Sequence, residues 1–252
     1  MNRATRFALS AAFVVLASLT TIPSSADVTV ERLRGCAGHL LVDLASGTSR
    51  WSPAMPSLAT IDVYDNLESP GDFGVASSDP AAVWGDSLTI SQTGIVESIT
   101  ITVLNSSSSL APLTSATFLV TLRDAATHVD IANYLFGATF AGGLPPGFYA
   151  MVSITGLSQA ALPLDLPTTR LVIEQSTSNA VGSTRLGVVS FTPPTVGTSP
   201  PSMYVSATTA FGGVPGFYTF VNGPADPGYD LKANVVDATR ETSWGRVKKL
   251  YR

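Results

Sequence analysis

The chain has 252 residues, a formal net charge of −4 at pH 7 and a single cysteine. The stretch from Trp51 to Leu231 holds 13 acidic side chains against three basic ones, a net charge of −10, whereas the last 21 residues carry six basic and two acidic side chains. The acidic body lacks the basic surface stripe that nucleic-acid binding needs, and a single cysteine excludes a disulfide within the chain.

Residues 1–26 have the pattern of a secretory signal peptide. Arg3 and Arg6 give a basic start, an apolar run of 13 residues extends from Phe7 to Leu19, and small residues end at Ala26. The apolar run is shorter than the ~20 residues that a membrane-spanning helix needs. We therefore expect cleavage directly after Ala26, and a mature protein without a transmembrane segment that is secreted, held at the cell surface or periplasmic.

Residues 27–57 are predicted to form an N-terminal arm or a first strand. They include the apolar run Leu40–Leu44, and Gly35 and Gly38 disfavour a helix because each glycine costs ~1 kcal/mol relative to alanine. Cys36 is the unpaired cysteine. In an exported chain we expect its thiol to be buried, with a free reactive group or a bond to another chain as alternatives.

From residue 58 to residue 236, apolar and Ser/Thr side chains alternate with a period of two, and Gly, Pro, Asn, Asp and Ser separate the runs. In one run, Ile99, Ile101 and Val103 share a face. This alternation is typical of antiparallel sheets with one solvated face, and helical periodicity between the runs is missing. The sequence therefore predicts an all-β domain over residues 58–236, an antiparallel, jelly-roll-like β-sandwich. About eleven strands are expected: Leu58–Tyr64, Ser87–Ser91, Ile95–Leu104, Thr117–Arg123, Ile131–Phe140, Phe148–Thr155, Arg170–Gln175, Arg185–Phe191, Met203–Thr208, Phe217–Val221 and Tyr229–Val236.

Two stretches, 134–152 and 204–221, share a strand, a Gly-Gly turn, a proline and then Gly-Phe-Tyr. We expect shared hairpin chemistry rather than an internal duplication, because such turn signals recur independently. A functional alternative is that Tyr149 and Tyr218 lie side by side on a sheet face and stack on a sugar ring. The candidate ligand-binding aromatic residues are Trp84, Tyr149, Phe217 and Tyr218.

Sequence motifs for catalysis are absent: there is no Gly-x-Ser-x-Gly, His-Glu-x-x-His, phosphate-binding glycine loop or Cys-x-x-Cys. With His39 and His128 as the two histidines, a three-histidine zinc site cannot form within one chain. No sequence spacing indicates a catalytic triad that uses His128, or a glycosidase carboxylate pair formed by Glu97 and Glu174. We therefore predict a non-catalytic protein with no catalytic residue and no required cofactor.

An acidic cluster offers a possible metal site. Asp62, Asp65 and Asp72 are candidates for structural calcium, which takes six to eight oxygen ligands. The same residue types are ordinary turn formers, and the spacing does not match an EF-hand loop. Calcium is therefore an optional ligand in this prediction.

Residues 237–252 form a basic tail. If the segment from Trp244 to Arg252 is helical, Trp244, Val247 and Tyr251 share one side. The alternatives are a frayed terminus, a final strand partner, or a tag that docks to an export or surface partner.

The order of the segments Ile61–Asn66, Trp84–Thr89 and Thr192–Gly197 resembles exported bacterial β-sandwich surface proteins of planctomycetes and cyanobacteria. Such proteins often carry PEP-CTERM sorting tails, but this chain lacks the Pro-Glu-Pro tag. The resemblance implies an exported, non-catalytic protein that acts in surface or extracellular binding or assembly, with polysaccharide or other surface proteins as partners. The alternatives are a carbohydrate-binding module with structural calcium and a glycoside hydrolase.

Overall fold

The computed structural model describes residues 28–53, 61–68, 70–79, 81–157, 166–191, 193–206, 214–219 and 226–234. The predicted signal peptide and basic tail lie outside these ranges. Within them the chain forms strands and no helix. The sixteen strands are β1 (Val28–Arg32), β2 (Gly35–Asp43), β3 (Thr48–Ser52), β4 (Ile61–Asp65), β5 (Pro70–Ser77), β6 (Val83–Thr89), β7 (Ile95–Asn105), β8 (Leu113–Asp124), β9 (Asp130–Leu144), β10 (Phe148–Thr155), β11 (Arg170–Val181), β12 (Leu186–Phe191), β13 (Met203–Ser206), β14 (Gly216–Tyr218), β15 (Asp226–Pro227) and β16 (Tyr229–Asn234).

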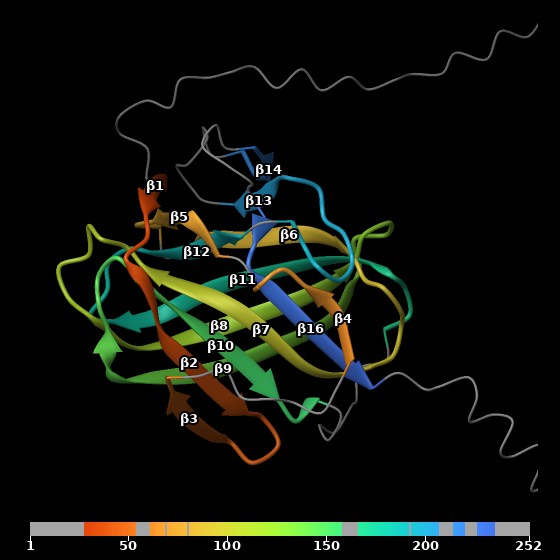
Figure 1. The fold of residues 1–252 in the computed structure, drawn as a ribbon, viewed down its shortest axis with the longest axis horizontal. Helices are drawn as coiled ribbons and strands as arrows, with labels where there is room; N and C mark the ends of the chain where they lie inside the picture. The colour runs from red at the N-terminus through yellow and green to blue at the C-terminus, as the bar shows by residue number, and fades with distance from the viewer. Residues whose placement is uncertain are drawn as a thin grey trace, which may run out of the picture.

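The strands form two sheets, which confirms the predicted all-β sandwich (Figure 1). One sheet has ten strands, with the path β1-β5-β12-β7-β10-β2-β3; β16 pairs with β7 and β4, and β15 pairs with β12. The other has six strands in the order β14-β13-β6-β11-β8-β9. Each of the eleven predicted strands overlaps one of these strands. The jelly-roll similarity stays a prediction.

The main core lies between the two sheets. Large side chains that are fully buried there include Phe118, Phe140 and Tyr229, from β8, β9 and β16. A smaller cluster around Trp84 and Val188 extends this core toward β1 and β13. A third cluster, with Leu104 and Phe191, lies on the opposite side of the ten-stranded sheet from the main core. Both faces of part of this sheet are therefore buried.

The segment predicted as an arm or first strand forms three strands of the ten-stranded sheet. Strand β2 pairs in parallel with β10, and the β2–β3 hairpin projects at one end of the molecule (Figure 1). The pairing register shifts beside Ala37, and Gly38 has a φ of +151°. A Cβ atom on Gly38 would lie 2.7 Å from the ring of Trp51, so only glycine fits there. This bulge interrupts the period-two alternation that would have identified the strand.

The two similar stretches occupy different architectures. After β9 the chain leaves the six-stranded sheet and enters the ten-stranded sheet as β10, whereas β13 and β14 pair with each other. The Gly-Gly turn of the second stretch lies outside the described residues, and shared turn chemistry stays a prediction. Cys36 is exposed on β2, so the expected burial of this residue was wrong.

Three aspartates are almost fully buried, with exposed fractions of 0% for Asp86 and 1% for Asp226 and Asp230. Asp86 faces the hydroxyl groups of Tyr64 and Ser199, and its burial, together with the charge of Asp226, raises its pKa to about 9. Burial raises the pKa of Asp226 to about 6 and that of Asp230 to about 7, the latter against the opposing effect of a nearby lysine.

We predict that the protein loses stability as the pH rises from 5 to 9. The three raised pKa values mean that the folded state retains protons that the unfolded state has released above about pH 4, so the free energy of unfolding falls with rising pH. Urea unfolding at pH 5, 7 and 9 measures this, and Asp86→Asn should reduce the loss between pH 7 and 9 by at least about 1 kcal/mol. Stability that increases toward pH 9 would contradict these protonation states.

Candidate functional site on the six-stranded sheet

The outer face of the six-stranded sheet carries the side chains that do not enter the core. On β13, Met203 and Val205 are buried between the sheets, so Tyr204 points outward. On β11, Ile173 is buried in the main core and Glu174 points outward. Successive side chains of a strand lie on opposite faces, and therefore every strand of this sheet presents its alternate residues on the outer face.

One row of outer-face residues crosses all six strands. The strand registers pair Phe217 with Tyr204, Tyr204 with Gly85, Gly85 with Glu174, Glu174 with Thr121, and Thr121 with Asn133. We call these six residues the cross-strand row. Since neighbouring strands lie about 4.8 Å apart, the row is roughly 24 Å long.

The β13–β14 end of the row is aromatic. The rings of Tyr204 and Phe217 lie with centroids 5.5 Å apart and planes at 61°, an edge-to-face arrangement. The exposed fraction of Phe217 is 47%, which is high for a large apolar side chain. This end therefore presents aromatic surface to solvent.

The β8–β9 end of the row is polar and charged. The Arg123 guanidinium contacts Asp130 at 2.9 Å and Glu174 at 3.4 Å. The Thr121 hydroxyl donates to the side-chain oxygen of Asn133 at 2.7 Å, and the Asn133 amide donates to Asp130 at 3.3 Å. Partial burial raises the pKa of Glu174, while Arg123 opposes this shift.

Gly85 lies in the middle of the row. A Cβ atom at this position would lie 2.6 Å from the backbone oxygen of Ile173 and 3.0 Å from Cγ of Glu174. Because Gly85 has no side chain, Glu174 can lie over β6 toward Tyr204. The pKa of the Tyr204 phenol is raised by burial and by the charge of Glu174. The aromatic and charged ends therefore meet at this glycine.

Three of the four predicted aromatic residues lie elsewhere. Trp84 and Tyr149 are buried, with exposed fractions of 3% and 4%, so the prediction that they stack on a ligand was wrong. Tyr149 packs against Phe191 behind the ten-stranded sheet, and Tyr218 packs against the cluster around Trp84. Tyr149 and Tyr218 therefore belong to different sheets. Only Phe217, of these four, lies on the outer face.

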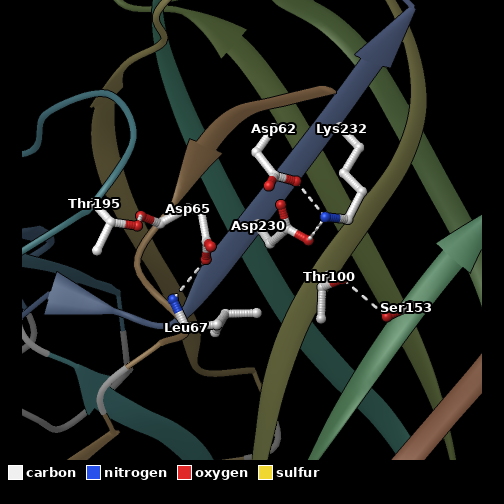
Figure 2. A network of polar contacts seen from close by, with 8 residues as sticks. All are labelled: Asp62, Asp65, Leu67, Thr100, Ser153, Thr195, Asp230 and Lys232. Carbon is white, nitrogen blue, oxygen red and sulfur yellow. Dashed lines mark hydrogen bonds and ion pairs between the residues drawn. The ribbon is translucent and has the colours of Figure 1, made fainter. Parts of the chain in front are cut away.

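The acidic cluster lies on the ten-stranded sheet (Figure 2). The register places Asp65 opposite Asp230 and Asp62 opposite Lys232, with one extra residue, Val63, on β4. In a regular strand, residues three positions apart lie on opposite faces. This bulge instead puts Asp62 and Asp65 on the same side of β4.

Lys232 provides the positive charge in this cluster. Its ammonium group lies between the carboxylates of Asp62 and Asp230, and its distance to Asp230 is 3.3 Å (Figure 2). Asp65 accepts a hydrogen bond from the Leu67 amide at 2.8 Å. Asp72 lies on β5, and its side chain is outside the described part of the structure. Within the described ranges no three His, Cys, Asp or Glu side chains converge on a metal position, and calcium binding stays a prediction.

The residues considered for catalysis do not come together. Glu97 lies on β7 and Glu174 on β11, in different sheets. His128 is exposed in the turn between β8 and β9, with a φ of +58°. Asp86 and Asp226 do interact electrostatically, but both are buried inside the domain. An assignment of a triad or a glycosidase pair gains no support from these placements.

We predict that Lys232→Met destabilises the protein more at pH 8 than at pH 5. Removal of the ammonium leaves Asp62 and the buried Asp230 uncompensated, at a cost of roughly 1–3 kcal/mol once partial solvent exposure of the pair is considered. At pH 5 the carboxyl group of Asp230, with a pKa of about 7, is already neutral. Thermal unfolding at both pH values measures the difference, with the exposed-site variant Arg170→Met as the control. An equal loss at pH 5 and pH 8 would contradict the assigned role of Asp230.

None of the described segments forms a helix with the length and apolar character that a membrane crossing requires. Comparison with protein-family models, with curated proteins and with solved structures gives no match for this chain.

Proposed function

We propose that this chain is an exported, non-catalytic β-sandwich protein that binds extracellular polysaccharide along the cross-strand row. The observation that carries the proposal is the row itself, in which an aromatic pair, the exposed Phe217 and the half-buried Tyr204, and a hydrogen-bonding group of side chains lie in one line across six strands. The length of about 24 Å suits an extended chain of sugar rings better than a single small molecule.

The chemistry of a sugar ring matches both ends of the row. The C–H face of a pyranose packs on an aromatic ring, and Phe217 and Tyr204 offer such surface. The hydroxyl groups of a sugar can donate to carboxylates and accept from a guanidinium, as Glu174 and Arg123 would require. The Arg123 side chain keeps an exposed fraction of 36%, so its guanidinium is accessible to a ligand hydroxyl, whereas Glu174, at 12%, is more buried.

Export is the second part of the proposal, and the pattern of residues 1–26 supports it. We predict that a bacterial host with a general secretion system removes these residues and releases a protein that begins at Asp27. Mass spectrometry of the exported protein measures its first residue. A full-length protein retained in the cytoplasm would contradict this part of the proposal.

Binding can be tested by affinity electrophoresis of residues 27–252 through gels that contain a panel of soluble polysaccharides. We predict retardation by at least one of them, and a loss of affinity of about tenfold, or 1.4 kcal/mol, for Tyr204→Ala and for Phe217→Ala. Leu110→Ala is the matched control because Leu110 is an exposed apolar residue away from the row, and it should bind normally. Retardation that both row variants retain, or no retardation by any polysaccharide, would refute the site.

Glycoside hydrolysis is the second candidate function, because Glu174 and Asp130 are two carboxyl groups that contact the same arginine on this face. The same polysaccharides, incubated with the protein, distinguish the two. Binding alone releases no reducing ends. Release that Glu174→Gln abolishes would replace binding with catalysis as the function of the row.

A further inference from the structure

Strand β9 is the longest strand of the structure, and it forms an edge of the six-stranded sheet. It extends over 15 residues and pairs with β8 on one side, while its other side has no strand partner among the described residues. The other strands with a single partner among the described residues, β1, β3, β4, β14 and β15, have two to five residues. Short edges limit unwanted pairing between molecules, so β9 is the exception in this fold.

The composition of β9 also lacks the usual protection of an edge. From Ile131 to Leu144 the strand contains no charged residue and no proline, whereas β1, β3 and β4 each contain at least one charged side chain. Charged side chains and prolines are the devices that keep natural edge strands from pairing with another chain. Leu135, in the middle of β9, has an exposed fraction of 70%.

The part of β9 that could receive a new strand is regular. Its register with β8 is continuous from Ala132 to Thr139, with shifts on both sides of this run. Beyond the run, Phe140 packs edge-to-face against Trp51 of β3. Seven paired residues in an antiparallel ladder form about six to eight backbone hydrogen bonds, within the range of a typical protein interface.

We propose that β9 is a homodimer interface, in which the edges of two copies of this chain pair antiparallel over residues 133–139, with Phe136 at the two-fold axis. A strand that pairs with its own copy meets its own charges, and an uncharged run imposes no like-charge repulsion. A two-fold axis perpendicular to the sheet would join the two six-stranded sheets into one sheet of twelve strands.

This pairing has a consequence for binding that does not depend on the identity of the ligand. Residues that pair across antiparallel strands lie on the same face, so both outer faces would lie on one side of the joined sheet. The cross-strand rows, each of which ends at Asn133 on β9, would then extend in opposite directions from the shared edge on the same side of the joined sheet. Two linked sites bind a long polymer more tightly than either site alone.

Sedimentation equilibrium of residues 27–252 tests the proposal, with reductant present so that Cys36 cannot link two chains. We expect a concentration-dependent dimer. The double variant Leu135→Lys/Thr139→Lys places like charges at diagonally neighbouring positions across the interface and should be monomeric. The control Leu110→Lys/Val181→Lys adds the same charge at exposed positions outside β9 and should dimerise as the unmodified protein does.

A charge exchange separates loss of pairing from loss of folding. Leu135→Glu/Thr139→Glu should also be monomeric by itself, and an equimolar mixture with the lysine variant should form a heterodimer. Circular dichroism of each variant checks that the β structure is retained. The proposal would be overturned if the unmodified protein is monomeric at every soluble concentration, or if the lysine variant still forms dimers. A monomer that binds an added extended peptide at this edge would assign the edge to a different partner. Monomeric protein that still binds polysaccharide would refute the dimer while leaving the proposed function intact.

Discussion

The structure depends on the two-residue period of the β-strands, which assigns each side chain to the core or to a surface. In the six-stranded sheet this period is kept along the cross-strand row. Val120 and Ile173 are buried between the sheets, while their neighbours Thr121 and Glu174 face outward. The same register therefore sets both the core packing and the outer row. A slip of one residue in any strand would move its core side chains to the outer face and its outer side chains into the core.

The ten-stranded sheet shows what happens where the period is interrupted. An extra residue at Val63 turns Asp62 and Asp65 to the same side of β4, and Lys232 on β16 contacts the carboxylates of Asp62 and Asp230 there. A bulge at Ala37 shifts the register of the parallel pairing between β2 and β10. At the Val63 bulge the result is a partly buried ionic cluster, in which Asp62 and Lys232 keep some solvent exposure and Asp230 is buried.

Much of the fold follows from sequence pattern alone, because alternation is a local property. The prediction of a strand at Phe148–Thr155 matches β10, and that at Ile95–Leu104 falls within β7. Strands β1, β2, β3, β5 and β15 were not individually predicted; Gly38 and Gly74 break the alternation of β2 and β5, and the other three have only two to five residues. Local pattern also cannot assign a strand to a sheet, which depends on contacts between residues far apart in the chain.

The same limit explains the errors in the predicted site. Trp84 and Tyr149 are aromatic residues in strands. Whether an aromatic side chain in a strand points inward or outward can be predicted only from the residues next to it. For Tyr204 that signal existed, because Met203 and Val205 are apolar neighbours that mark the inner face. The grouping of Arg123, Asp130 and Glu174, however, required the pairing of β8, β9 and β11.

An NMR titration of the isotope-labelled protein, residues 27–252, with an oligosaccharide from a bound polysaccharide tests the central claim most directly. The account predicts amide shift changes that concentrate at the cross-strand row and its outward neighbours on all six strands, from Phe217 to Asn133. Shift changes confined to the ten-stranded sheet around Asp62 and Lys232, or spread without preference over the surface, would contradict it.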